Sequence, residues 1–90
     1  MSNQRYDKIL SRLEEAFKPQ SLELADESHL HAGHAGAEGG RGHYRLRIVS
    51  NAFNGLRPIA RHQLVYRSLG EMMQTDIHAL SISALTPVEI

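Results

Sequence analysis

The chain of 90 residues contains no cysteine. Disulfides, thiolate metal ligands and thiol nucleophiles are therefore excluded for this chain acting alone. It also has no apolar run near the ~20 residues that a membrane-spanning helix needs. Its first ten residues, MSNQRYDKIL, lack the apolar core of a signal peptide. We therefore expect a cytoplasmic protein without membrane contact.

The chain also lacks an excess of either charge, because ten basic residues balance ten acidic ones. Zero net charge gives no global reason to expect a nucleic acid as partner. The charge is unevenly distributed, however, since six arginines and no acidic residue lie between Arg41 and Arg67. A local basic half can contact a phosphate backbone. A solvated face of strand and helix is the plainer interpretation.

Hydrophobic periodicity predicts five elements of secondary structure. Apolar residues recur at helical spacing in two segments and alternate with polar residues in three others, which gives helix 6–17, strand 21–26, strand 43–50, helix 57–73 and strand 77–85. In the second helix, one arc of the helical wheel should face the core. This arc contains Ile59, His62, Val65, Tyr66, Leu69, Met72 and Met73.

The order of these elements predicts the topology. The first two strands follow each other closely enough to pair antiparallel. A helix connects the second strand to the third, so these two should be parallel with a right-handed crossover. We therefore predict one domain over residues 1–90 with an α+β fold of order α-β-β-α-β, in which both helices pack on one face of a three-stranded mixed sheet.

Histidine is the most conspicuous residue type. Four of the six histidines, His29, His31, His34 and His43, lie in DESHLHAGHAGAEGGRGHY, residues 26–44. Imidazoles can bind zinc, copper, nickel or iron. This spacing matches no specific site, however, and a glycine-rich segment loses entropy when it converges on a metal. A solvated loop, or one that contacts a partner, is the alternative.

The other two histidines lie in regular elements. His62 is one turn into the second helix, where the positive end of the helix dipole disfavours the imidazolium and keeps the neutral form that a metal requires. A partly buried histidine bonded to a backbone carbonyl is the alternative. His78 heads the third strand, and we expect it to be structural or solvated. We find no convincing serine–histidine–carboxylate grouping and no phosphate-binding glycine loop, so we expect no enzyme.

The sequence resembles the BolA family in several motifs that occur in one order: DES before the histidine-rich segment, RIVS…F.G, RHQLVY, IHAL and the closing TP.E. The resemblance covers nearly the whole chain. It implies a KH-like fold of the second type. It also implies a role, because BolA-like proteins pair with monothiol glutaredoxins and share a [2Fe–2S] cluster with them in iron–sulfur cluster trafficking and iron regulation.

In that pairing a glutaredoxin cysteine and a glutathione thiol ligate one side of the cluster. The resemblance implies that His62, from the RH motif, is one ligand from this chain. It implies His31, three residues after DES, as the other, with His29 and His34 as substitutes. A chain without thiols cannot hold an iron–sulfur cluster alone. We therefore expect no cofactor in the isolated protein, which should be a monomer or a weak homodimer.

Two further hypotheses stay open. A nucleic-acid-binding regulator is suggested by the family's KH-like fold and its reported regulatory roles, with Arg45, Arg47, Arg57 and Arg61 as the phosphate contacts to DNA. The segment FNGLR offers only one glycine, whereas KH modules use a Gly-x-x-Gly clamp. The third hypothesis is autonomous zinc or nickel binding by the histidines of the glycine-rich segment.

Overall fold

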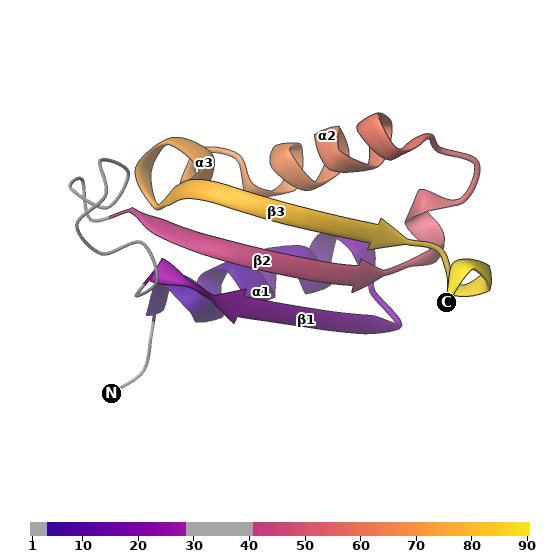
Figure 1. The fold of residues 1–90 in the computed structure, drawn as a ribbon, viewed down its shortest axis with the longest axis horizontal. Coiled ribbons are helices and arrows are strands. Elements are labelled where there is room, and N and C mark those ends of the chain that lie inside the picture. Colours follow the sequence, from indigo (N-terminus) through magenta and orange to yellow (C-terminus); the bar gives the residue numbers. More distant parts are fainter. Residues whose placement is uncertain (1–3, 29–40) are drawn as a thin grey trace.

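The structure, a computed structural model, describes residues 4–28 and 41–90. Its elements are α1 (Gln4–Phe17), β1 (Ser21–Asp26), β2 (Gly42–Val49), η3 (Asn51–Phe53), α2 (Pro58–Leu69), α3 (Met72–Thr75), β3 (Ile77–Leu85) and η4 (Pro87–Glu89) (Figure 1). The two helices and three strands expected from periodicity are confirmed. Within the described ranges, no helix is long and apolar enough to cross a membrane.

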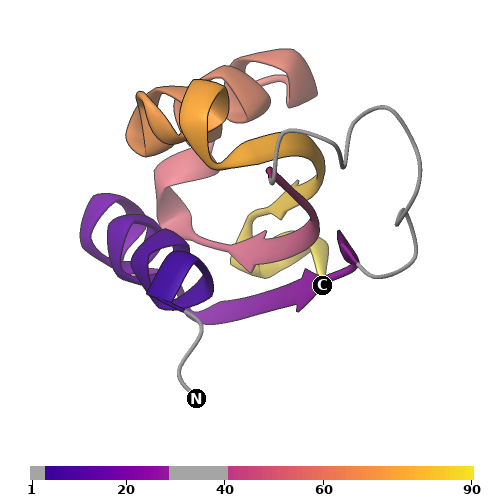
Figure 2. The same cartoon turned by 90° about the vertical axis from the view of Figure 1, so that its left-hand side faces the viewer.

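The three strands form one sheet in the order β1-β2-β3. β1 pairs antiparallel with β2, and β2 pairs parallel with β3, as predicted. On the central strand, Tyr44, Leu46 and Ile48 are buried while Arg45 is exposed. The buried face of the sheet lies against α1 and α2, and no helix covers the opposite face in the described part of the chain (Figure 2). The α+β fold with both helices on one side is therefore confirmed.

The core lies between this face and the two helices. α1 buries Ile9, Leu13 and Phe17, which recur every four residues and so share one side of the helix. Phe53 from η3 fills the end of the core, where its ring centroid lies 5.1 Å from that of Phe17. Each such side chain stabilises the fold by roughly 1.5–3 kcal/mol when buried.

The second helix is shorter than predicted. It ends at Leu69 and not near residue 73, because Gly70 adopts a positive φ of 56° and turns the chain. Arg12 from α1 donates a hydrogen bond of 2.9 Å from Nη1 to the carbonyl of Leu69, which satisfies one of the last carbonyls of α2. Met72 then begins a separate turn, α3, and remains buried.

The predicted buried arc of α2 is also partly wrong. Val65 and Leu69 are buried as expected, but Ile59 is 70% exposed and Tyr66 is 41% exposed. Arg61 is only 9% exposed, although a charged side chain is expected to face solvent. The helix is therefore rotated relative to the prediction, and His62 lies half-buried at the margin of the core.

Arg61 faces inward because its guanidinium has partners for its donors. Nε donates to the carbonyl of Leu56 (2.8 Å), and Nη1 donates to the carbonyl of Ala84 (2.9 Å). Nη1 and Nη2 also donate to the two carboxylate oxygens of Glu89, at 2.6 and 3.1 Å. The bidentate pair connects α2 to η4, and the bond to Ala84 connects α2 to β3. Hydrogen bonding by Arg61 is the main reason why the pKa of Glu89 falls from 4.5 to about 2.

Glu89→Gln should lower the melting temperature near neutral pH by a few degrees, because Arg61 would lose its charged partner. The pKa of Glu89 is lower in the folded state than in the unfolded chain. The pair therefore stabilises the fold above about pH 4.5, and this contribution disappears as the pH falls towards 2. Thermal unfolding of the wild type and of Glu89→Gln should converge over that window.

Glu71→Gln is the matched control, because Glu71 is an exposed glutamate that follows the C-terminal end of α2. It should leave the melting temperature nearly unchanged. An equal loss of stability in the two variants would contradict the role given to the Arg61–Glu89 pair.

Candidate metal-ligand site

One end of the molecule collects the end of β1 and the beginnings of β2 and β3. The amide of Glu27 donates to the carbonyl of His43, and the amide of Gly42 donates to the carbonyl of Asp76, both at 2.8 Å. These bonds hold the three chain segments together. We call this region the histidine end and define it by Ser28, Arg41, Gly42, His43 and His78.

Two imidazoles meet at the histidine end. The ring centroids of His43 and His78 lie 5.0 Å apart, with the planes inclined by 47°. A register shift causes this contact, since Gly42 pairs with Ile77 whereas His43 pairs with Ala79. His78 is therefore the extra residue of a β-bulge, a feature that often redirects a side chain next to a functional site. His43 is 9% exposed, while His78 is exposed.

Hydrogen bonds fix the surroundings of both rings. The amide of His43 donates to Ser28 Oγ at 3.0 Å, and the amide of Ser28 donates to Asp26 Oδ1 at 3.0 Å. On the other side, Arg41 Nη2 lies 3.3 Å from His78 Nδ1, and its Nη1 donates to the carbonyl of Gln74 at 3.4 Å. The main chain of His43 and the ring of His78 are thus positioned by different neighbours.

A charged pair lies beneath the histidine end. Arg5 Nε of α1 lies 3.5 Å from Asp76 Oδ2, just before β3 begins. The hydroxyl of Thr75 donates to the same carboxylate, and this bond is the main reason why the pKa of Asp76 is lowered. Burial raises the pKa of Tyr44, which lies near these charges. The pair connects α1 to the start of β3.

His62 lies elsewhere in the molecule. Its neighbour Arg61 is bonded to Ala84, which lies six residues along β3 from His78. Six residues of strand span roughly 20 Å. α2 begins at the end of the sheet where β3 finishes, opposite the histidine end (Figure 1). The structure therefore does not bring the predicted ligand His62 to the end of the sheet from which the histidine-rich segment departs.

The other predicted ligands, His31 and its substitutes His29 and His34, lie outside the described residues. The hypothesis of autonomous zinc or nickel binding rests on the same histidines and stays a prediction. Within residues 4–28 and 41–90, no group of three or more His, Cys, Asp or Glu side chains could hold a metal ion. The described part of the chain thus offers at most part of a metal site.

The four arginines proposed as phosphate contacts do not form one surface. Arg45 and Arg47 lie on the helix-free face of the sheet, and Arg45 is paired with Glu27. Arg57 is exposed before α2. Arg61 is buried and bonded to Glu89 and two carbonyls. The choice of Arg61 as a phosphate contact is therefore not supported, because its donors are already occupied.

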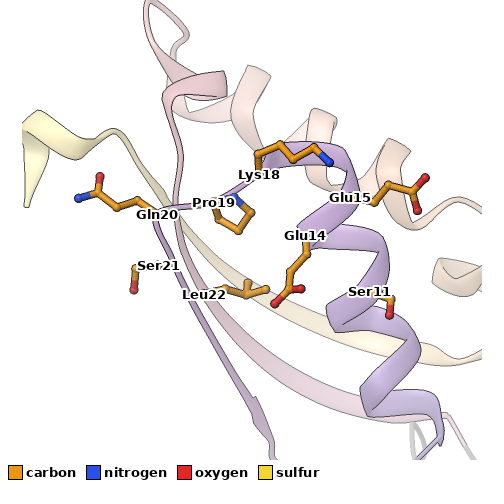
Figure 3. A pocket seen from close by; sticks show the side chains of 8 residues that line it. All are labelled: Ser11, Glu14, Glu15, Lys18, Pro19, Gln20, Ser21 and Leu22. Atoms are coloured by element: carbon orange, nitrogen blue, oxygen red, sulfur yellow. The ribbon is translucent and has the colours of Figure 1, made fainter.

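A broad open hollow of about 760 Å³ lies between the second half of α1 and the start of β1. Figure 3 shows its rim, which carries Glu14, Glu15 and Lys18 but no histidine. This hollow is formed at the end of β1 remote from Ser28. We therefore do not assign the imidazole chemistry to it.

A model of the BolA family, described as BolA-like protein, matches residues 13–89. The chain belongs to the BolA family. It is 44% identical over 81 residues to BolA-like protein 1 from Homo sapiens, a match that covers 90% of this chain and 57% of that protein. It is 39% identical over 83 residues to the DNA-binding transcriptional regulator BolA from Vibrio cholerae, covering 92% of this chain and 76% of that one.

The solved structures agree with this membership. The BolA domain of SufE1 from Arabidopsis thaliana superposes with a TM-score of 0.85 at 39% identity, covering 100% of this chain and 99% of that domain. The fold is therefore that of a BolA domain. The chain spans little more than half the length of the human relative, so activities of longer BolA proteins do not transfer to it directly.

The position of His78 beside His43 and Arg41 is a feature that the sequence analysis did not predict. A histidine at the head of a strand is by itself typical of a structural or solvated residue. One signal was available, because the third strand runs parallel to the second and the second begins directly after the histidine-rich segment. The heads of both strands must therefore lie where that segment ends.

Gly42→Ala should disturb the histidine end, because an added Cβ would lie 2.6 Å from Tyr44 Cε2 and 2.9 Å from Ser28 Oγ. Overpacking of this kind costs about 1–3 kcal/mol. We expect a lower free energy of unfolding by denaturant titration, together with shifted ring resonances of His43 and His78.

Gly55→Ala is the control, since a Cβ at that position meets nothing within 4 Å but must accept a φ of +78°. It should cost about 1–2 kcal/mol through backbone strain alone and leave both ring resonances in place. Unchanged resonances in Gly42→Ala would show that this glycine does not set the geometry of the pair.

Proposed function

We propose that this protein is a non-enzymatic partner of a monothiol glutaredoxin and shares a [2Fe–2S] cluster with it in iron–sulfur cluster trafficking or iron regulation. Membership of the BolA family supports this role, because the family resemblance implies it. The partner, the cluster and the cytoplasmic location all stay predictions. The observation that carries the proposal is the exposed imidazole of His78 beside His43.

The donor chemistry of the chain fits half of such a cluster. Iron–sulfur clusters are held mainly by cysteine, and histidine replaces two cysteines on one iron in Rieske centres. This chain has six histidines and no cysteine. It can therefore supply imidazoles to one iron only if another molecule supplies thiolates to the second. A glutaredoxin cysteine and glutathione are such thiolates.

We assign the first ligand to His78 in place of His62. His78 is exposed, lies on a strand of the sheet and has its ring packed against His43, which limits its freedom. His43 itself is a poor ligand because it is buried. Because one ligand is held on a rigid strand, less entropy is lost when a second ligand binds the same iron.

The second ligand would come from His31, with His29 or His34 as substitutes. His31 follows Ser28 by three residues, and three residues of extended chain reach ~10 Å. Ser28 is itself bonded to the main chain of His43. His31 is therefore within easy chain reach of the histidine end, whereas His62 is about one strand length away. A bound cluster would supply a transferable iron–sulfur unit whose reduction potential is raised by its imidazole ligands.

Mixing the protein with a monothiol glutaredoxin, glutathione, iron and sulfide should give a coloured heterodimer whose visible circular dichroism differs from that of the glutaredoxin homodimer. His78→Ala should abolish this spectrum or weaken the complex at least tenfold, because one of two imidazole ligands is lost. His62→Ala should retain the spectrum. Size-exclusion chromatography with absorbance detection measures both properties.

These two variants are matched, because each removes one imidazole from a regular element of the fold. If His62→Ala abolishes the spectrum while His78→Ala keeps it, the assignment of the ligand is wrong. If the wild type gives only the spectrum of the glutaredoxin homodimer, the proposed function itself is wrong.

A second candidate function is DNA binding, which is favoured by the name of the Vibrio cholerae relative, DNA-binding transcriptional regulator BolA. Arg47 and Arg57 are the arginines best suited to phosphate contacts, because no hydrogen bond or ion pair occupies their side chains within the described residues. Arg45 is paired with Glu27, and Arg61 is buried.

If the protein binds DNA, titration at two salt concentrations should show affinity that falls as salt rises. Arg47→Ala should weaken binding for all sequences and lower the salt slope by about 1. Arg61→Ala is unsuitable as a test because it would disturb the fold. Absence of binding at low salt would exclude this candidate.

A further inference from the structure

The ring of His78 has an unusual neighbour for a metal ligand. Arg41 Nη2 lies 3.3 Å from His78 Nδ1, within hydrogen-bond distance. A guanidinium carries five N–H donors and no acceptor, and it keeps its proton in proteins. The bond can form only if Nδ1 presents its lone pair. In a neutral imidazole the proton then resides on Nε2.

From this contact we infer that Arg41 is a positioning residue that occupies the Nδ1 lone pair of His78, keeps the ring proton on Nε2 and so leaves neither ring nitrogen free to bind a metal while the contact lasts. The contact itself does not depend on the proposed function. Its consequence for cluster binding rests on that function.

Arg41 is held in place from two sides. Its Nη1 donates to the carbonyl of Gln74 in α3, and the next residue, Gly42, donates its amide to the carbonyl of Asp76. The guanidinium therefore spans from the start of β2 to the turn before β3. A shorter or uncharged side chain at this position could not make both contacts.

The hydrogen bond at the His78 ring runs in the opposite direction to that at an ordinary metal site. A ligating histidine almost always donates its second ring N–H to a carboxylate or carbonyl, which frees the other nitrogen for the metal. Among the described residues, no carboxylate or carbonyl accepts a hydrogen bond from the His78 ring. A cationic donor takes that place instead.

The consequence is competition for one lone pair. In the tautomer that Arg41 selects, Nδ1 is the only ring nitrogen with a lone pair, and Arg41 already uses it. Iron can bind at Nδ1 only after the guanidinium has moved away. It can bind at Nε2 only after that nitrogen has lost its proton, and a proton transferred to Nδ1 would face the Arg41 donor. Arg41 would therefore lower the affinity of His78 for iron and make ligation depend on displacement of this side chain. Because His78 is exposed and Arg41 is only half-buried, water competes with the contact and its effect should be modest.

The direct test is the position of the ring proton in the metal-free protein. Long-range proton–nitrogen NMR of ¹⁵N-histidine-labelled protein at pH 8.5 distinguishes the two tautomers. In the wild type, His78 should carry its proton on Nε2, with a larger excess of this tautomer than His62 shows. Arg41→Met, which keeps the length but removes the donors, should lower the excess about fivefold.

A charge reversal gives a result that a merely structural role would not produce. In Arg41→Glu, a carboxylate would accept from Nδ1–H, so the proton of His78 should move to Nδ1. Arg41→Lys should retain the wild-type tautomer, because a lysine also only donates. Arg45→Met is the matched control, as it removes an exposed arginine four residues further along that contacts Glu27 and not His78.

A proton on Nδ1 in the wild type would overturn the inference. An identical tautomer in the wild type, Arg41→Met and Arg41→Glu would also overturn it. The Arg45→Met variant should behave like the wild type, and an equal change there would assign the effect to general electrostatics and not to Arg41.

Cluster binding supplies the second readout. With cluster-loaded glutaredoxin, Arg41→Met should form the cluster-bridged heterodimer with about two- to fivefold higher affinity than the wild type. If the tautomers shift as expected but no variant forms the heterodimer, the proposed function fails and the role of Arg41 towards His78 stands. If the heterodimer forms with equal affinity in all variants, Arg41 does not compete with iron.

Discussion

The parallel pairing of β2 with β3, interrupted by one bulged residue, is the constraint on which the histidine end depends. Pairing of Gly42 with Ile77 and of His43 with Ala79 leaves His78 as the extra residue. Without the shift, His43 and His78 would occupy ordinary neighbouring positions in the ladder. Because of it, an exposed imidazole lies against a buried one at the end of a rigid sheet.

Gly42 and Arg41 belong to the same arrangement. Gly42 leaves space that Tyr44 and Ser28 occupy, so the three segments can approach closely at this point. Arg41 then reaches across to Gln74 and His78. One imidazole, that of His78, is thus held at the end of the sheet with its Nδ1 lone pair facing Arg41. In the proposed function, the remaining ligands would come from the histidine-rich segment and from thiols of other molecules.

The sequence was sufficient for the architecture and insufficient for the site. Alternation in HYRLRIVS and helical spacing in YDKILSRLEEAF fixed the elements, because burial of one face follows directly from periodicity. The α2 prediction failed where a polar residue entered the core. Arg61 is buried through bonds to residues 23 and 28 positions away, and periodicity cannot reveal such partners.

The distance of His62 from the histidine end was not predicted, for a related reason. His62 was judged by its position in a helix, whereas the use of a ligand depends on which end of the sheet it occupies. That property follows from the direction of β3 relative to β2. The β-bulge at His78 and the contact with Arg41 depend on local geometry and could not be predicted from the sequence.

The central claim is that His78 contributes an imidazole to an iron–sulfur cluster whose thiolates belong to other molecules. Pulsed electron paramagnetic resonance of the reduced heterodimer, with ¹⁵N-histidine in this chain only, tests it directly. We expect ¹⁵N couplings from two histidines in the wild type and in His62→Ala, and the loss of one coupling in His78→Ala. Absence of any ¹⁵N coupling from this chain, or two couplings retained in His78→Ala, would contradict it.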